Sequence, residues 1–415
     1  MSRMQRKIKA IGVYKVPALW DQKTEFIKTK KFTYETENVT EFNEHKSRVT
    51  SILDNIYFNI FVGLIESKNI SEAHYIFVDE SRETNTTFEC KGVNVWVLKT
   101  CEDVMDFNDG DYYFVRGKYA NLYDALIPEK AFVVMYPATS FAFHYNITNK
   151  IIQKRRLQRR YNFKDHSFYK KIDILLCHED EMYERIYGRY SKLVELYKYG
   201  SDKFSNLNLR TRYVDFIFVA DATQHTKNHQ LMFDFMNYCE NKQLPINFIY
   251  VSVKDILKKR HHNFIDRGDH ITIEYYENIS PDDLNVLFNM SRINLCFSGR
   301  DAVPRTISES LCAGCFNIAL DTLSDGKFYY NGVFGEIIGD PESMVKLGKS
   351  RSLSYIGSEG LWKKILQLHS KSFDHKMISE SFQVKYNLQS LMSDIKSAER
   401  SITAEVSISN TRILR

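Results

Sequence analysis

The segment 299–314, GRDAVPRTISESLCAG, places two carboxylates eight positions apart, with Asp301 before Pro304 and Glu309 after it. Proline suits the first position of a helix and Gly314 stands where a helix stop is expected, so the pattern predicts a helix over 304–313. The amino end of a helix offers unpaired N–H groups and a positive dipole, which together favour a phosphate group. This segment is therefore a candidate site for a phosphorylated ligand.

Side chains near this helix start could bind the rest of such a ligand. Arg305 and Thr306 add a positive charge and a hydroxyl, and Glu309 shares a helix face with Thr306 by the three-residue spacing. A carboxylate at Glu309 can accept both hydroxyls of a ribose. Asp301, on the preceding loop, can accept the hydroxyls of a sugar on the other side of the phosphates. The spacing alone also fits an ordinary turn of an α/β protein, so both interpretations stay open at this point.

The elements that would position these residues are short apolar runs separated by helix-like stretches. Near-continuous apolar runs are typical of strands buried on both faces, and their alternation with helices predicts parallel sheets. In such sheets ligands bind at the carboxyl ends of the strands. The expected strands are 8–16, 74–80, 93–100, 111–117, 131–137 and 172–179 in the first half, and 214–220, 247–253, 271–277, 292–298 and 315–321 in the second half.

The chain of 415 residues is too long for one typical core and suits two domains. A polar stretch at 199–211 separates the two sets of expected strands. We therefore expect an α/β protein with two Rossmann-like domains that face each other across a cleft. The expected boundaries are 1–205 for an acceptor-side domain, 206–375 for a nucleotide-sugar-binding domain, and 376–415 for a helical segment that packs back on the first domain.

Several motifs in the second half resemble one known family. The run DAVPRTISESLCAG resembles the E-x7-E segment of retaining glycosyltransferases with two Rossmann-like domains, the GT-B fold of the family 4 type. Asp301 and Glu309 stand at its two glutamates. VDFIFVADATQHTKNHQ resembles the strand and loop that read G-R-x-x-x-x-K-G in that family, with Lys227 at the lysine. ITIEYYENISPDDLNVLFNMSRINLCFS and GEIIGDPESM also match in order, so the resemblance covers about 206–350.

The resemblance implies a transferase that moves a hexosyl or pentosyl group from a nucleotide diphosphate sugar, with UDP or GDP as the nucleotide, to an acceptor hydroxyl with retention of configuration. It implies no metal and no separate cofactor. Lys227, Asp301 and Arg305 would be the catalytic residues. The donor-binding residues would be Glu309, Thr306, Ala302, Val303, Pro304, Arg300 and Tyr276, with the nucleobase near Tyr275 and Tyr276. Thr139 and His144, on a loop of the first domain, would lie on the acceptor and sugar side.

One departure from the family pattern concerns the diphosphate site. Asp221 stands at about the place of the family's loop arginine, so the missing cation would have to come from Arg300, Arg305 or Arg212. This departure motivates an alternative function, a catalytically degenerate binding or scaffold protein that keeps the fold.

The charge balance excludes a dedicated nucleic-acid binder, because 57 Lys and Arg against 52 Asp and Glu give a net charge of only +5. The basic segment 150–164, KIIQKRRLQRRYNFK, is a solvated helix face or a contact for a phosphate-bearing acceptor, an anionic membrane surface or nucleic acid. A glycosyltransferase acting on modified DNA bases is therefore a further alternative. A glycan, a lipid-linked molecule and a modified nucleic acid all remain possible acceptors.

The sequence carries no secretory signal and no apolar stretch of membrane-spanning length. Its 7 Cys residues are an odd number and include only one C-x-x-C pair, Cys312 and Cys315, with no second pair to complete a zinc site. This favours free thiols in a reducing compartment over disulfides or a zinc site. We therefore expect a cytoplasmic protein without a bound metal.

Overall fold

The computed structural model describes residues 8–15, 32–45, 52–68, 70–117, 119–136, 167–177, 191–196, 203–298, 304–323, 326–339, 344–347, 352–355 and 357–413. These residues form two compact units. The described residues up to 196 and those from Leu388 onward form unit 1, and those from 203 to Asn387 form unit 2.

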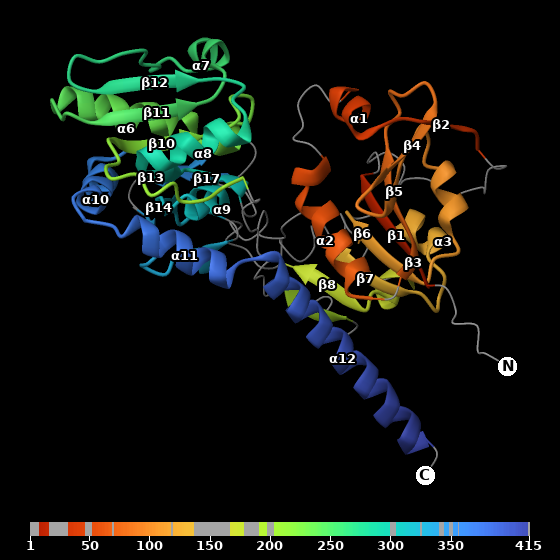
Figure 1. Cartoon of the computed structure of the whole chain (residues 1–415). Coiled ribbons are helices and arrows are strands. Elements are labelled where there is room, and N and C mark those ends of the chain that lie inside the picture. The colour runs from red at the N-terminus through yellow and green to blue at the C-terminus, as the bar shows by residue number, and fades with distance from the viewer. Residues whose placement is uncertain are drawn as a thin grey trace. The chain divides into compact units, whose positions relative to one another are not determined.

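Unit 1 is built on a nine-stranded sheet with the order β2-β4-β5-β3-β1-β6-β7-β8-β9 (Figure 1). All neighbouring strands run parallel except β4 and β5, which form an antiparallel hairpin. The strands are β1 (Ile8–Lys15), β2 (Tyr34–Thr36), β3 (Ile70–Val78), β4 (Asn85–Cys90), β5 (Val93–Leu98), β6 (Tyr112–Arg116), β7 (Phe132–Tyr136), β8 (Ile174–Cys177) and β9 (Lys192–Glu195). The helices are α1 (Val39–His45), α2 (Ile56–Glu66), α3 (Ala120–Leu126) and α12 (Leu388–Ile413).

Helix α12 belongs to unit 1, where it packs on α2, β8 and β9 (Figure 1). Leu391 and Ile395 are fully buried in this contact. Glu399 accepts hydrogen bonds from Lys68 Nζ at 2.9 Å and from the hydroxyl of Tyr112 at 3.2 Å. Apolar burial and these polar contacts both fix the helix on the unit.

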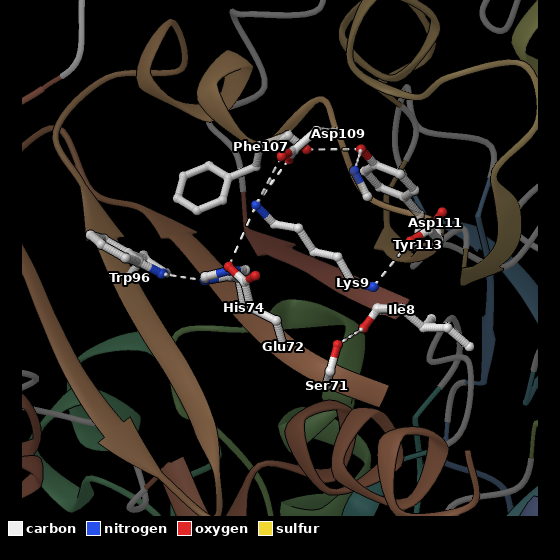
Figure 2. Close-up of polar contacts among 11 residues, drawn as sticks. Ile8, Lys9, Ser71, Glu72, His74, Trp96, Phe107, Asp109, Asp111 and Tyr113 are labelled. Carbon is white, nitrogen blue, oxygen red and sulfur yellow. Dashed lines mark hydrogen bonds and ion pairs between the residues drawn. The ribbon is translucent and has the colours of Figure 1, made fainter. Parts of the chain in front are cut away.

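The amino edge of the unit 1 sheet carries a chain of polar contacts (Figure 2). Lys9 Nζ lies 2.9 Å from Asp109 and 3.6 Å from Glu72, which in turn lies 2.6 Å from Nε2 of His74. Trp96 Nε1 donates to His74 Nδ1 at 2.9 Å. Indole nitrogen can only donate, so Nδ1 is the acceptor and Nε2 carries the proton that is donated to Glu72. Burial lowers the pKa of His74, which keeps the ring neutral.

Unit 2 is built on a six-stranded parallel sheet with the order β12-β11-β10-β13-β14-β15. The strands are β10 (Val214–Val219), β11 (Asn247–Val251), β12 (Thr272–Tyr276), β13 (Ser291–Cys296), β14 (Phe316–Leu320) and β15 (Gly335–Ile338), and a separate hairpin joins β16 (Met344–Leu347) to β17 (Ser352–Tyr355). The helices are α6 (His229–Asn241), α7 (Lys254–Arg260), α8 (Pro281–Met290), α9 (Arg305–Cys312), α10 (Glu359–His369) and α11 (His375–Lys385). The strand order is that of a Rossmann sheet, which confirms the expected α/β fold of this half.

Among the described helices, none combines the length and the apolar character that crossing a bilayer requires.

The packing of α12 predicts how strongly unit 1 depends on it. Ile395→Ala should destabilise unit 1 by about 2–4 kcal/mol, because it leaves a cavity beneath a fully buried side chain. Lys396→Ala, on the exposed side of the same helix turn, should change stability by less than about 0.5 kcal/mol. Hydrogen exchange of the β8 and β9 amides under increasing denaturant measures both effects, and equal exchange in the two variants would contradict the packing role.

Candidate functional site

The strand order of unit 2 reverses between β10 and β13. β11 and β12 lie on one side of β10, whereas β13, β14 and β15 follow on the other side. β10 and β13 pair in parallel, with Phe216 opposite Ile293 and Ile217 opposite Asn294. The loops that follow these two strands therefore leave the same edge of the sheet, at the point where open α/β sheets bind ligands.

Helix α9 follows β13 at this edge. It begins at Arg305, and its N-cap residue Pro304 makes no side-chain cap hydrogen bond. Ile307 and Leu311 are fully buried. Gly314 has a φ of +88°, the left-handed conformation that ends the helix. The predicted helix 304–313 is thus confirmed with ends shifted by one residue, and the N–H groups of its amino end can donate to a phosphate.

Glu309 lies in the second turn of α9 and is only 7% exposed. Its Oε1 forms an ion pair with Nη2 of Arg305, one turn earlier, at 3.1 Å. Arg305 is exposed and Thr306 half-buried. The helix therefore presents a buried carboxylate whose charge is compensated by an arginine that solvent can reach.

A buried polar cluster fixes α9 on the sheet. Asn294 of β13 donates through Nδ2 to Ser310 Oγ at 3.1 Å and to Asn317 Oδ1 of β14 at 2.6 Å, and Ser310 donates to Asn317 at 3.1 Å. All three residues are at most 1% exposed. Hydrogen bonds inside a core are directional, so they set the register of α9 more sharply than apolar contacts do. The sequence analysis missed this cluster, although polar residues inside two otherwise apolar strands were a usable signal.

The loop after β10 carries Lys227 and is attached to the end of β13. Lys227 is half-buried and ends a short 3-10 helix (His225–Lys227). Asn228, which follows, has a φ of +54° and donates through Nδ2 to the carbonyl of Phe297 at 2.7 Å. Asn228 stands where the resembling motif has its glycine, and asparagine tolerates this left-handed backbone better than most residues. The Lys227 loop is therefore in direct contact with the residue that follows β13.

His229, which the sequence analysis did not single out, fixes the other end of this loop. Its Nε2 donates to the carbonyl of Asp221 at 2.9 Å, and its Nδ1 accepts from the hydroxyl of Tyr250 at 2.7 Å. A carbonyl can only accept, so Nε2 carries a proton, and in the neutral ring Nδ1 is then the acceptor for the tyrosine hydroxyl. Burial lowers the pKa of His229 to about 4. His229 is thus a neutral support for the backbone of the loop.

Asp221 places a carboxylate at the position where the resembling family has its loop arginine, so it supplies no positive charge there. Its carboxylate accepts from the backbone N–H and the hydroxyl of Thr223, both at 2.8 Å, and from Gln224 at 3.2 Å. Burial raises the pKa of Asp221, but these hydrogen bonds outweigh it and the net change is downward. Arg260 of α7 donates to the carbonyls of Ala222 and Thr223 at 3.3 and 3.0 Å. A cation from another element therefore lies beside this loop.

Arg212, one of the three candidate replacements for the missing arginine, is engaged elsewhere. It precedes β10 and so lies at the opposite edge of the sheet. Its guanidinium donates to the carbonyls of Ser291 at 2.8 Å and Ala313 at 2.6 Å. Arg212 therefore holds the amino edge of the sheet together, and the prediction that it could supply the missing positive charge at the diphosphate site is wrong.

The two tyrosines expected near a nucleobase end strand β12. Tyr275 stacks on Tyr250 with ring centroids 5.4 Å apart and is held by a hydrogen bond to the carbonyl of Ile265. The hydroxyl of Tyr276 donates to Glu274 at 2.6 Å. Both tyrosines lie at the carboxyl edge of the sheet, but the ring and hydroxyl of Tyr275 are already in contact with Tyr250 and Ile265.

Other predicted residues lie outside the described residues. They are Thr139, His144, Arg300, Asp301, Ala302, Val303 and the basic segment 150–164. Within the described ranges, no group of three His, Cys, Asp or Glu residues is arranged to hold a metal ion.

The neutral state of His229 predicts a loss of stability in acid. The folded pKa of about 4 lies below the unfolded value of about 6.5, so the stabilisation is complete above pH 6.5 and is lost as the pH falls toward 4. Unit 2 should lose roughly 3 kcal/mol through this group over that range. An NMR titration of the His229 ring checks the cause directly, and a midpoint near 6.5 would contradict it.

A comparison with protein-family models finds no match, and one with curated protein sequences finds none either. Solved structures match over almost the whole chain. α,α-Trehalose-6-phosphate synthase from Burkholderia multivorans has a TM-score of 0.60 at 9% identity, over 98% of this chain and 99% of that chain. Sucrose-phosphate synthase from Thermosynechococcus elongatus has a TM-score of 0.59 at 11% identity, over 96% and 100%. Anabaena HepE in complex with UDP has a TM-score of 0.52 at 10% identity, over 95% and 100%.

At these identities the likeness concerns the fold, and it covers both units. The two parallel α/β sheets match two Rossmann-like domains over nearly the full chain. The chain therefore has the GT-B fold, the fold of retaining glycosyltransferases that use nucleotide sugars.

Proposed function

We propose that this protein is a retaining glycosyltransferase that moves a sugar from a nucleoside diphosphate sugar to an acceptor hydroxyl. The observation that carries the proposal is the contact between the Lys227 loop and the segment leading to α9, made by Asn228 at the reversal point of the unit 2 sheet. The Lys227 loop and the start of α9 thus belong to the same edge of the sheet. The GT-B fold and the UDP bound by the similar HepE support a nucleotide as the ligand.

In this proposal the amino end of α9 and Lys227 bind the diphosphate. N–H groups at a helix start and a lysine ammonium both favour phosphate oxygens. Glu309 accepts the ribose hydroxyls, and Arg305 compensates its charge from one turn away. Asp301 binds the transferred sugar, with Thr306, Arg300 and the backbone of 302–304 assisting, and the base lies near Tyr276.

The chemistry follows from where charge develops. The acceptor oxygen attacks the anomeric carbon on the face that the diphosphate leaves, and a phosphate oxygen of the donor takes the acceptor's proton. Negative charge then grows on the leaving diphosphate, where Lys227, Arg305 and the α9 dipole stabilise it. Arg260, which holds the loop backbone beside Asp221, contributes positive potential without the family's loop arginine.

The alternative of a binding protein without transferase activity is motivated by Asp221, whose carboxylate replaces a cation at the diphosphate site. It predicts nucleotide binding without sugar transfer or donor hydrolysis. Turnover of any one nucleotide sugar would exclude it.

The proposal predicts that Lys227→Ala lowers turnover by at least about a hundredfold, because a preorganised charge partner of the leaving group is lost. Lys242→Ala is the matched control, since this exposed lysine caps the far end of α6. Release of nucleoside diphosphate from a panel of UDP-, GDP- and ADP-sugars is the measurement. Near-normal turnover in Lys227→Ala, with the same donor that the wild type uses, would reject the assigned role.

A further inference from the structure

The strand order of unit 1 also reverses, at strand β1. β3 and then β5 lie on one side of β1, whereas β6, β7, β8 and β9 follow outward on the other. β1 pairs in parallel with both β3 and β6, so the carboxyl ends of these strands share one edge. The rule that places ligands at such a reversal point applies to this unit as it does to unit 2.

Arg116, the last residue of β6, lies at this edge among aromatic rings. Its guanidinium carbon is 4.7 Å from the ring centroid of Tyr14, at the end of β1, and 4.7 Å from that of Tyr57, in the first turn of α2. Tyr136, the last residue of β7, stacks on Tyr57 at 4.9 Å, and Tyr75 of β3 stacks on Tyr14 at 6.0 Å. We call Tyr14, Tyr57, Tyr75 and Tyr136 the tyrosine cluster.

The charge of Arg116 has no carboxylate partner among the described residues. The groups that act on its pKa are its own burial, which lowers it, and the tyrosine hydroxyls, which outweigh burial and raise it. Among the described residues, its buried Nε has no hydrogen-bond partner, and neither has the fully buried hydroxyl of Tyr75. The rest of the Arg116 side chain shares one hydrogen bond with the hydroxyl of Tyr57. Two unpaired buried donors in one cluster are unusual, because each costs free energy.

Lys9, at the amino edge of the same sheet, provides the contrast. It lies within ion-pair distance of both Asp109 and Glu72 (Figure 2). A cation that only holds the fold together is thus paired with carboxylates in this unit. Arg116, at the carboxyl edge of the sheet, has aromatic neighbours instead.

The backbone around Arg116 is held firmly. Its carbonyl accepts a hydrogen bond from the hydroxyl of Tyr123 at 2.5 Å. Gly117, which follows with a φ of +92°, donates to the carbonyl of Tyr136 at 2.8 Å. The arginine is therefore presented from a rigid strand end, which is how binding groups are preorganised.

Aromatic faces stabilise a guanidinium through their electrons, and the Tyr57 hydroxyl accepts one hydrogen bond from Arg116, but Nε and other N–H groups in the guanidinium plane can still donate. The natural partner in that plane is a planar or tetrahedral oxyanion, which can accept two parallel hydrogen bonds. Neutral tyrosine hydroxyls can donate further hydrogen bonds to the same oxygens. Burial raises the pKa of Tyr57 and Tyr75, so both keep their protons at neutral pH.

We propose that the edge between β1 and β6 binds an oxyanion group, phosphate or carboxylate, of the acceptor, with Arg116 and the tyrosine cluster as its binding residues. The identification of this ligand as the acceptor rests on the proposed function, whereas the oxyanion site is a property of unit 1 alone.

The test uses the full chain without nucleotide and reads hydrogen exchange only in peptides covering 53–62 and 112–117. Inorganic phosphate and acetate are the probes, and chloride at equal ionic strength is the reference. Some amides in these peptides exchange only when the site opens. At an anion concentration about ten times its dissociation constant, their exchange should be about tenfold slower, because the anion binds only the closed site. Phosphate acting at lower concentration than acetate indicates a phosphorylated acceptor, and the reverse order indicates a carboxylate.

Arg116→Met keeps an unbranched stem between the rings and should abolish the protection. Arg116→Lys keeps the charge without the planar fork and should weaken it, which preserves the test if the methionine variant does not fold. Arg82→Met is the matched control, because Arg82 is already paired with Glu37 at 3.2 Å, and should bind like the wild type. Undiminished protection in both Arg116 variants, or no protection of the wild type beyond chloride, would overturn the proposal. The result does not depend on sugar transfer, so failure of the transferase assignment would leave it standing.

Discussion

The parallel pairing of β10 with β13 is the constraint on which the candidate donor site depends. Because the strand order reverses there, two loops distant in sequence leave the sheet side by side. One carries Lys227 and the other leads to α9. The hydrogen bond from Asn228 to the carbonyl of Phe297 then joins the two directly. Every role proposed for this edge requires that junction.

Neutral polar groups, more than ion pairs, hold the site in place. His229 supports the loop through two hydrogen bonds in its uncharged form, and the cluster of Asn294, Ser310 and Asn317 fixes α9 on the sheet. Buried hydrogen bonds between neutral groups avoid the desolvation of charge, yet still require one geometry. The charged residues, such as Arg305, are then left at positions where a ligand can reach them.

The strands expected from the sequence and α9 are all present, because apolar runs and the Pro304 and Gly314 signals act locally. The sequence analysis did not expect β2, β4, β9, β15 or the β16–β17 hairpin. It does not predict long-range partners. Arg212 was a candidate for the site, but its hydrogen bonds to carbonyls brought together by folding hold it at the opposite edge. The aromatic surroundings of Arg116, without a carboxylate among the described residues, are likewise visible only when β1, β6 and α2 are assembled. Residues 300–303 lie outside the described residues, so the role of Asp301 stays a prediction.

The central claim is that the carboxyl edge of unit 2 binds a nucleoside diphosphate through α9. Titration calorimetry of UDP, GDP and ADP on the wild type, on Glu309→Gln and on the exposed control Glu380→Gln tests it most directly. We expect one nucleotide to bind the wild type and the control equally, and to bind Glu309→Gln at least about tenfold more weakly, as loss of hydrogen bonds to a charged group implies. No binding to the wild type, or equal affinity in all three proteins, would contradict the account.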